Sequence, residues 1–128
     1  MGDVFPTVSD AEMQVLKALW AEGPGTVREI NSRLRRRKRR WAYNTVLTLL
    51  SRLREKGFVS SQPKGAAHVF QAAVSREELL RRRLTELADR LCDGIASPLV
   101  TALVKGQRFS TEEIAGFRQL LDELEQQE

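Results

Sequence analysis

Four short stretches of this sequence place a Ser or Thr three residues before a Glu, a pattern that starts helices. The hydroxyl can accept a hydrogen bond from the third helical N–H, while the carboxylate reaches back to the N–H of the capping residue. The pairs are Ser9 with Glu12, Thr26 with Glu29, Ser75 with Glu78, and Ser110 with Glu113. Helices are therefore expected to begin near both ends of the chain, and the fold is predicted to be mainly α.

Three helices are predicted in the first half. The first spans residues 10–22, and Gly23-Pro24-Gly25 stops it; the second starts at Val27 and frays within a run of arginines. A third, over residues 42–56, ends where Gly57 can cap it. Helical spacing predicts that the third helix buries Val46, Leu49, Leu50 and Leu53, and that it faces outward with Asn44, Thr45, Thr48, Ser51 and Arg52.

A β-hairpin is predicted directly after the third helix. Residues 58–62 and 67–73 are rich in β-branched and aromatic side chains, and Pro63-Lys64-Gly65 between them has turn composition. Three helices followed by a hairpin is the order of a winged helix-turn-helix, in which the third helix enters a DNA groove. The prediction is a winged-helix DNA-binding domain over residues 1–75, followed by a helical dimerisation domain over residues 76–128.

The second half carries more apolar surface than three short helices can bury. One interpretation is that these helices pack back on the first domain; the alternative is a partner chain, which we favour because the stripes follow a heptad-like spacing. A homodimer is the simplest such assembly. The predicted dimerisation residues are Leu80, Leu84, Leu87, Leu91, Leu99, Val100, Leu103, Ile114, Phe117, Leu121 and Leu124.

Charge is distributed unevenly along the chain. The net charge is +4, but residues 1–75 hold 13 Lys and Arg against 6 Asp and Glu, whereas residues 76–128 hold 8 against 11. A basic run alone can be a solvated arm, yet an excess confined to one half favours a footprint for a polyanion. The densest part is a run of six cations, Arg35, Arg36, Arg37, Lys38, Arg39 and Arg40.

The residue inventory argues against an enzyme. His68 is the only histidine, it falls in the predicted hairpin, and it is expected to be a strand residue or a phosphate contact. No Ser or Cys has a base at a recognisable spacing, and there is neither a metal-ligand set nor a Gly-rich phosphate loop, so no cofactor or metal is expected. Apolar runs are too short to span a membrane, and the single Cys92 suits a reducing compartment, so a cytoplasmic protein is expected.

The outward face of the third helix has the chemistry of a DNA reader. Asn can pair with adenine, Thr can touch the thymine methyl group, and Arg can bind guanine through two hydrogen bonds. Asn44, Thr45, Thr48 and Arg52 would therefore read bases, while the preceding cations would hold phosphates. Two alternatives remain: a broadly acting, nucleoid-type DNA-binding protein, and a basic module that docks an acidic protein.

Two segments resemble the penicillinase-repressor (BlaI/MecI) family of bacterial transcriptional repressors. They are VSDAEMQVLKALWAEGPGTVREI and WAYNTVLTLLSRLREKGFV, and the tail GIASPLVTALVKGQRFSTEEIAGFRQLLDELEQ is similar to the dimerisation region of that family. The resemblance is close over residues 8–75. It implies a homodimer whose winged-helix domains bind an inverted-repeat operator and block transcription until the repressor is inactivated.

The resemblance also implies roles for single residues. Asn44, Thr45, Thr48 and Arg52 match the operator-reading face of the family, and residues 64–68, including Lys64 and His68, match the tip of its wing. Trp41 and Tyr43 match aromatic positions beside the DNA backbone. The chain lacks the C-terminal cysteine cluster of copper-responsive members, and its arginine run is heavier than the family requires.

In the family that this chain resembles, the members that respond to β-lactams are substrates of a membrane sensor protease. That protease cuts them at an Asn-Phe bond. Aligning SPLVTALVKG with the helix that is cut places Ala102 and Leu103 at that bond. These two residues equally fit plain interface packing. A sensor protease is therefore an expected partner only if it prefers a sequence other than Asn-Phe.

Overall fold

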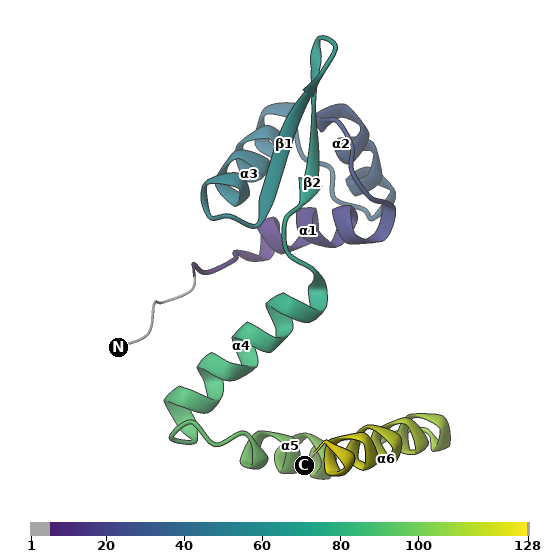
Figure 1. Cartoon of the computed structure of the whole chain (residues 1–128). Coiled ribbons are helices and arrows are strands. Elements are labelled where there is room, and N and C mark those ends of the chain that lie inside the picture. Colours follow the sequence, from purple (N-terminus) through teal and green to yellow (C-terminus); the bar gives the residue numbers. More distant parts are fainter. Residues whose placement is uncertain (1–5, 128) are drawn as a thin grey trace. The chain divides into compact units, whose positions relative to one another are not determined.

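The computed structural model describes residues 6–127, and the chain divides into two compact units, Met1–Arg83 and Leu84–Glu128 (Figure 1). The elements of the first unit are α1 (Asp10–Glu22), α2 (Val27–Arg36), α3 (Tyr43–Glu55), β1 (Val59–Lys64) and β2 (Ala67–Ala72). Helix α4 (Arg76–Leu91) begins in this unit. Helices α5 (Ser97–Gly106) and α6 (Thr111–Gln126) belong to the second unit.

The predicted helix starts are confirmed at α1, α2, α4 and α6. At α1, the Glu12 N–H donates to Ser9 Oγ at 3.1 Å, and the Ser9 N–H donates to Glu12 Oε1 at 2.8 Å. The same reciprocal pair forms at the starts of α2 and α6. At α4, the Glu78 N–H donates to Ser75 Oγ at 3.0 Å. These bonds satisfy N–H groups that have no partner within a helix, which fixes where each helix begins.

Helix α3 buries the four apolar residues predicted for it. It ends through a closing turn in which the Phe58 N–H donates to the Leu53 carbonyl at 2.9 Å, and the Gly57 N–H donates to the Arg54 carbonyl at 3.1 Å. Gly57 has φ 87°, a left-handed conformation that costs glycine little. Helix α2 ends in a similar turn instead of fraying: the Arg39 N–H donates to the Leu34 carbonyl at 2.8 Å.

The hairpin is present, but its predicted turn is wrong. Lys64 pairs with Ala67, so the loop is Gly65 and Ala66, and Pro63 lies inside β1 opposite His68. Gly65 has φ 63°, as the first position of a two-residue hairpin loop requires. Pro63 is tolerated because β1 lies at the edge of its sheet, where a missing N–H does not interrupt a ladder.

Arg33 anchors the loop between α1 and α2. Its side chain is only 9% exposed, and its guanidinium donates to the carbonyls of Gly23 and Pro24. A Cβ atom at Gly25 would lie 2.9 Å from Arg33 Nη2, so any larger residue there would require the Arg33 guanidinium to shift. Gly25 in turn exchanges two backbone hydrogen bonds with Phe70 of β2, at 3.0 and 2.8 Å. The loop that Arg33 contacts is therefore joined to the hairpin through the backbone of Gly25.

A buried ion pair joins α1 to the end of α3. Glu12 is 2% exposed, and its Oε1 accepts a hydrogen bond from Lys56 Nζ at 2.7 Å. Burial alone would raise the pKa of the Glu12 carboxyl, but the hydrogen bonds from Lys56 and Ser9 and the Lys56 charge outweigh it and lower that pKa below 4.5. Glu12 therefore stabilises the fold above the pKa of the unfolded chain, and this contribution is lost as pH falls through the folded pKa.

We expect Lys56→Met to lower the free energy of unfolding at pH 7 by about 2 kcal/mol, because it leaves a buried carboxylate without its cation. The difference from the wild type should shrink as the pH falls through the folded pKa of Glu12, because below it the carboxyl is protonated in both proteins. Urea unfolding at pH 7 and at a series of lower pH values measures both effects. The matched control is Arg36→Met, which removes a similar 2.8 Å pair with Glu22 at an exposed position and should cost little. Equal losses in the two variants would contradict the prediction.

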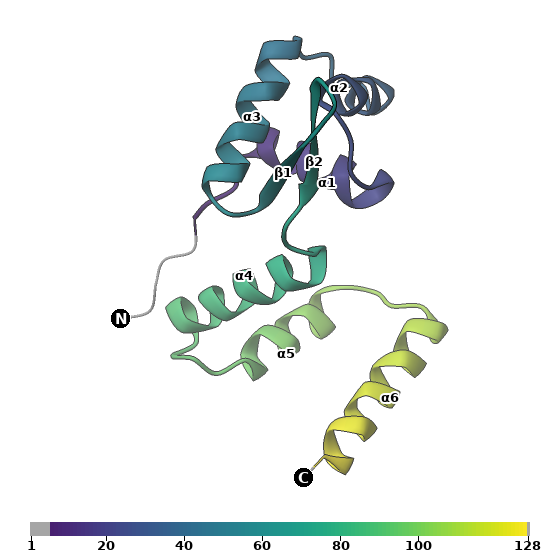
Figure 2. The same cartoon turned by 45° about the horizontal axis from the view of Figure 1, so that its top comes forward.

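The second unit presents most of its large apolar side chains to solvent in this chain. Helices α5 and α6, joined by residues 107–110 (Figure 2), contain no buried residue. Phe109 and Phe117 pack edge to face with ring centres 5.2 Å apart, so the segment before α6 is held to that helix. Among the described residues, no helix is long and apolar enough to cross a membrane.

Candidate nucleic-acid interface

Helix α3 presents the polar face that the sequence predicts. Asn44, Thr45, Thr48 and Arg52 are exposed, whereas Ser51 is only partly so. Thr48 Oγ1 donates its proton to the Asn44 carbonyl at 2.9 Å. The Thr48 oxygen and methyl group therefore remain available for contact with a base edge, and its rotamer is set in advance by its own helix.

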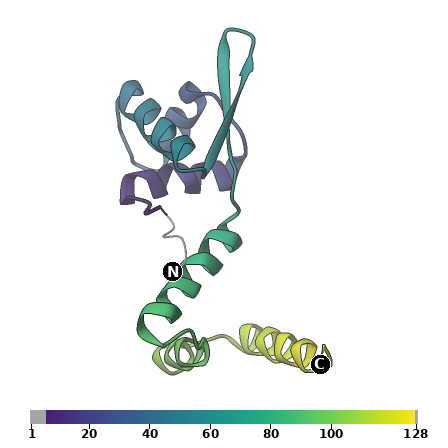
Figure 3. The same cartoon turned by 60° about the vertical axis from the view of Figure 1, so that its left-hand side comes forward.

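The hairpin of β1 and β2 is the wing of this fold, and its free end extends beyond the helices (Figure 3). Lys64 and His68 are both exposed there. The Thr26 N–H and hydroxyl hold the pKa of Glu29 below its usual range, and the positive charges of Arg33 and Lys64 act in the same direction.

The basic cluster, Arg35–Arg40, comprises the last two residues of α2 and the turn that follows, and all six side chains are exposed. Two contact α1 or its end: Arg36 pairs with Glu22 at 2.8 Å, and Arg37 donates to the Lys17 carbonyl at 3.5 Å. Lys38 has φ 65°, a conformation that costs a residue other than glycine about 1 kcal/mol. Lys38 is thus the left-handed residue of the turn that closes α2.

The two aromatic residues predicted at the DNA backbone differ in placement. Trp41 is partly buried and packs against the hydrophobic core, and it lines a hollow of about 540 Å³ with Arg35, Arg40 and Ala42. Tyr43 is 49% exposed. Trp41 therefore has a structural role as well as a place beside the cations.

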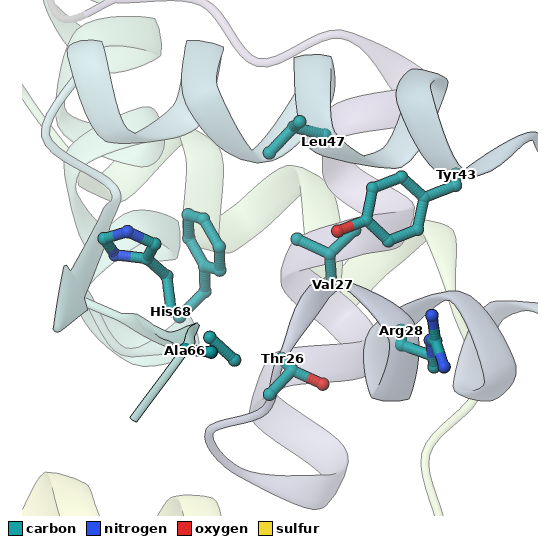
Figure 4. Close-up of a pocket in the computed structure, with 9 residues that line it drawn as sticks. Thr26, Val27, Arg28, Tyr43, Leu47, Ala66 and His68 are labelled. Carbon is teal, nitrogen blue, oxygen red and sulfur yellow. The ribbon is translucent and has the colours of Figure 1, made fainter. Parts of the chain in front are cut away.

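The sequence pattern did not single out Leu47 of α3. This side chain is 37% exposed, although it lies within a helix whose other leucines are buried. Together with Tyr43, one turn earlier, it faces the start of α2 and the hairpin across an open groove (Figure 4). An apolar residue on a reading face has no polar signature, so helical spacing alone gives no signal for it.

The predicted dimerisation residues belong to α4, α5 and α6 and not to the elements of this face. Leu80 lies in the first unit, and the others lie in the second. All are exposed except Leu99, which is partly buried. Ala102 and Leu103 are exposed positions within α5. Among residues 6–127, no three His, Cys, Asp or Glu side chains gather as metal ligands.

Comparisons with known proteins agree on one family. The profile described as penicillinase repressor matches residues 8–123. The transcriptional regulator BlaI of Mycobacterium tuberculosis is 32% identical over 120 residues, which cover 92% of this chain and 85% of that protein. The penicillinase repressor of Bacillus licheniformis is 25% identical over 119 residues, covering 93% and 92%.

A solved structure confirms the winged-helix fold. The DNA-binding domain of the repressor BlaI is similar with a TM-score of 0.51 and 26% identity, covering 60% of this chain and 93% of that one. The sequence profile spans both units of the chain. The protein belongs to the penicillinase repressor family.

Proposed function

We propose that this protein is a homodimeric transcriptional repressor that binds an inverted-repeat DNA operator. The observation that carries the proposal is the row of exposed Asn, Thr and Arg side chains on α3, which lies between the basic cluster and the wing. Such a row can read base edges in a major groove, while cations on either side bind phosphates. Residues 1–75 would form the DNA-binding domain, and residues 76–128 would form the dimer.

Two other functions compete with this proposal. A nucleoid-type protein would bind DNA through the cations alone, and a protein-interaction module would use them to bind an acidic partner. Neither function needs the exposed side chains on α3, because a phosphate or carboxylate is bound by charge without base reading. A set of hydrogen-bonding side chains one helical turn apart therefore favours sequence-specific DNA.

Competition footprinting tests the proposal. Genomic fragments selected by the purified protein would supply the operator, and the footprint would be repeated with a large excess of random DNA. A specific repressor keeps its site, because specific binding is typically at least about 1,000-fold tighter than non-specific binding. Loss of the footprint would favour the nucleoid-type function, and no DNA binding at all would favour the protein module.

Dimerisation, location and inactivation belong to the same proposal. Two copies would cover their exposed α5 and α6 stripes with each other, and the repressor would act in the cytoplasm, where its operator lies. If a sensor protease inactivates it by cutting between Ala102 and Leu103, the cut would divide α5 and separate α6 from the rest of the chain. An enzyme with a preference other than Asn-Phe would be required, because this chain has Ala and Leu there.

Thr48→Ala and Arg52→Ala are each expected to weaken binding to the selected operator by about 1 to 3 kcal/mol. Each should also relax the preference at one base position per half-site, since each removes a contact to a base edge. Binding to random DNA should change little in the Thr48 variant. Titrations on the operator and on its single-base variants provide the measurement.

Glu55→Ala is the matched control, because Glu55 is exposed at the end of α3 and carries no predicted base contact. It should leave the base preferences as they are. If Thr48→Ala and Arg52→Ala weaken binding equally on every DNA sequence, these residues do not read bases.

A further inference from the structure

A groove lies between α3 and the wing and has no assigned role. It has a volume of about 450 Å³ and is formed by three elements of the first unit: the start of α2, one side of α3 and the hairpin (Figure 4). We call it the wing groove. Its lining residues are Thr26, Val27, Arg28, Tyr43, Leu47, Ala66, Ala67, His68 and Phe70.

The wing groove has an apolar floor and a polar rim. Phe70 is 2% exposed and Val27 is 6% exposed, so these side chains form the floor, and Leu47 lies above them on α3. In Figure 4 the Tyr43 hydroxyl points toward Val27, and Arg28 and His68 lie on opposite sides of the space. The rim therefore offers hydrogen-bond donors to an anion, while the floor offers contact to a carbon framework.

The position of the groove indicates its occupant. If α3 enters the major groove and the wing reaches the adjacent minor groove, one sugar-phosphate strand must run between them, because one strand separates neighbouring grooves of a duplex. The wing groove is the space between these two elements. A deoxyribose has the apolar face that suits Leu47, and its phosphate carries the charge that suits Arg28.

We propose that the wing groove binds one deoxyribose-phosphate unit of the operator in each half-site. Arg28 and Tyr43 donate to the phosphate, and Leu47 packs against the sugar. The contact continues the predicted interface, since Tyr43 stands one residue before Asn44 on α3. The proposal rests on the proposed function, and it adds Arg28 and Leu47, which lie outside the predicted set of DNA-contacting residues.

The test uses the full-length protein and the selected operator, in which single phosphates are replaced by uncharged methylphosphonates. In the wild type, neutralising one particular phosphate per half-site should weaken binding several-fold. This phosphate should lie at the boundary of the major groove that α3 reads. Arg28→Ala should weaken binding to all sequences and reduce the salt slope by about 1 per half-site. In that variant, neutralising the same phosphate should have no further effect.

Arg35→Ala is the matched control, because it also removes one exposed arginine from the DNA-binding half. It should weaken binding while leaving the sensitivity at the wing-groove phosphate intact. Leu47→Ala should weaken binding without changing the salt slope, since it removes no charge. Circular dichroism would verify that the variants keep their helices.

Three outcomes would overturn the proposal. In the first, Arg28→Ala binds DNA as tightly as the wild type. In the second, Arg28→Ala still binds more weakly when the wing-groove phosphate is neutralised, as the wild type does. In the third, Arg35→Ala loses its sensitivity to neutralisation of that phosphate. Each leaves the footprint of the wild type unchanged, so the proposed function would survive. A wild type without any footprint would instead end both proposals.

Discussion

Replacing Leu103 and Leu121 together with Asp is expected to convert the protein to a monomer and to weaken its binding to a full inverted repeat by about 100-fold or more. Both residues are exposed in a single chain, and Leu121 is 59% exposed. In a dimer each would be covered by the partner, and a buried, unpaired carboxylate there would cost far more than the loss of apolar packing. The affinity for an isolated half-site should stay the same, because α3 and the wing are not altered.

Sedimentation and titrations on full and half operators measure these effects. The matched control is Thr101→Asp with Gln119→Asp, which adds the same two charges to α5 and α6 at exposed positions outside the apolar stripes. The control should remain a dimer. A wild type that sediments as a monomer would mean that the stripes serve another purpose, and packing on the first unit would become the preferred interpretation.

Local patterns predicted much of the first unit and the start of α6 in the second. The hydroxyl and carboxylate pairs determine where α1, α2 and α6 begin, because both partners lie within four residues of each other. The buried side of α3 follows from the 3.6-residue period. Gly57 closes that helix because a left-handed residue is needed there. Each of these features depends on neighbours in the sequence.

The errors and omissions involve contacts between distant residues or competing local signals. Pro63-Lys64-Gly65 has turn composition, yet pairing of Lys64 with Ala67 moves the loop to Gly65 and Ala66. In the sequence, Arg33 looks like another cation of the basic region. In the structure its side chain is buried and donates hydrogen bonds to the carbonyls of Gly23 and Pro24. Leu47 gave no signal because an apolar residue on a helix suggests a core position. Its exposure follows from where the hairpin and the start of α2 lie.

The candidate interface likewise combines features that depend on neighbours in the sequence with features that depend on distant residues. The polar face of α3 could be predicted from one helix alone, whereas the wing groove needs α2, α3 and the hairpin together. Gly25 joins the loop before α2 to β2 through its two backbone bonds to Phe70, and the Arg33 guanidinium lies against it. No short motif encodes such an arrangement, since its members lie far apart in the sequence of the unit.

Neutralising four cations of the basic cluster is expected to weaken binding to operator and random DNA alike by on the order of 100-fold at physiological salt. The changes are Arg35→Gln, Lys38→Gln, Arg39→Gln and Arg40→Gln. Arg36 and Arg37 are retained because they contact Glu22 and Lys17. The reason is counterion release: removal of one phosphate contact reduces the slope of log K against log salt by about 0.9. Base preferences should be unchanged, since these side chains lie before α3 and not on its reading face.

The matched control removes the same number of positive charges from the second unit, with Gln at Arg90, Lys105, Arg108 and Arg118, all of which are exposed. Both proteins have the same net charge, so a general field effect would weaken them equally. A contact made by the basic cluster would instead weaken only the first variant and lower only its salt slope. Titrations between low and moderate salt on both DNAs distinguish the two. If the first variant bound only the operator more weakly, the cluster would take part in base reading, and the assignment of its cations to phosphates would be wrong.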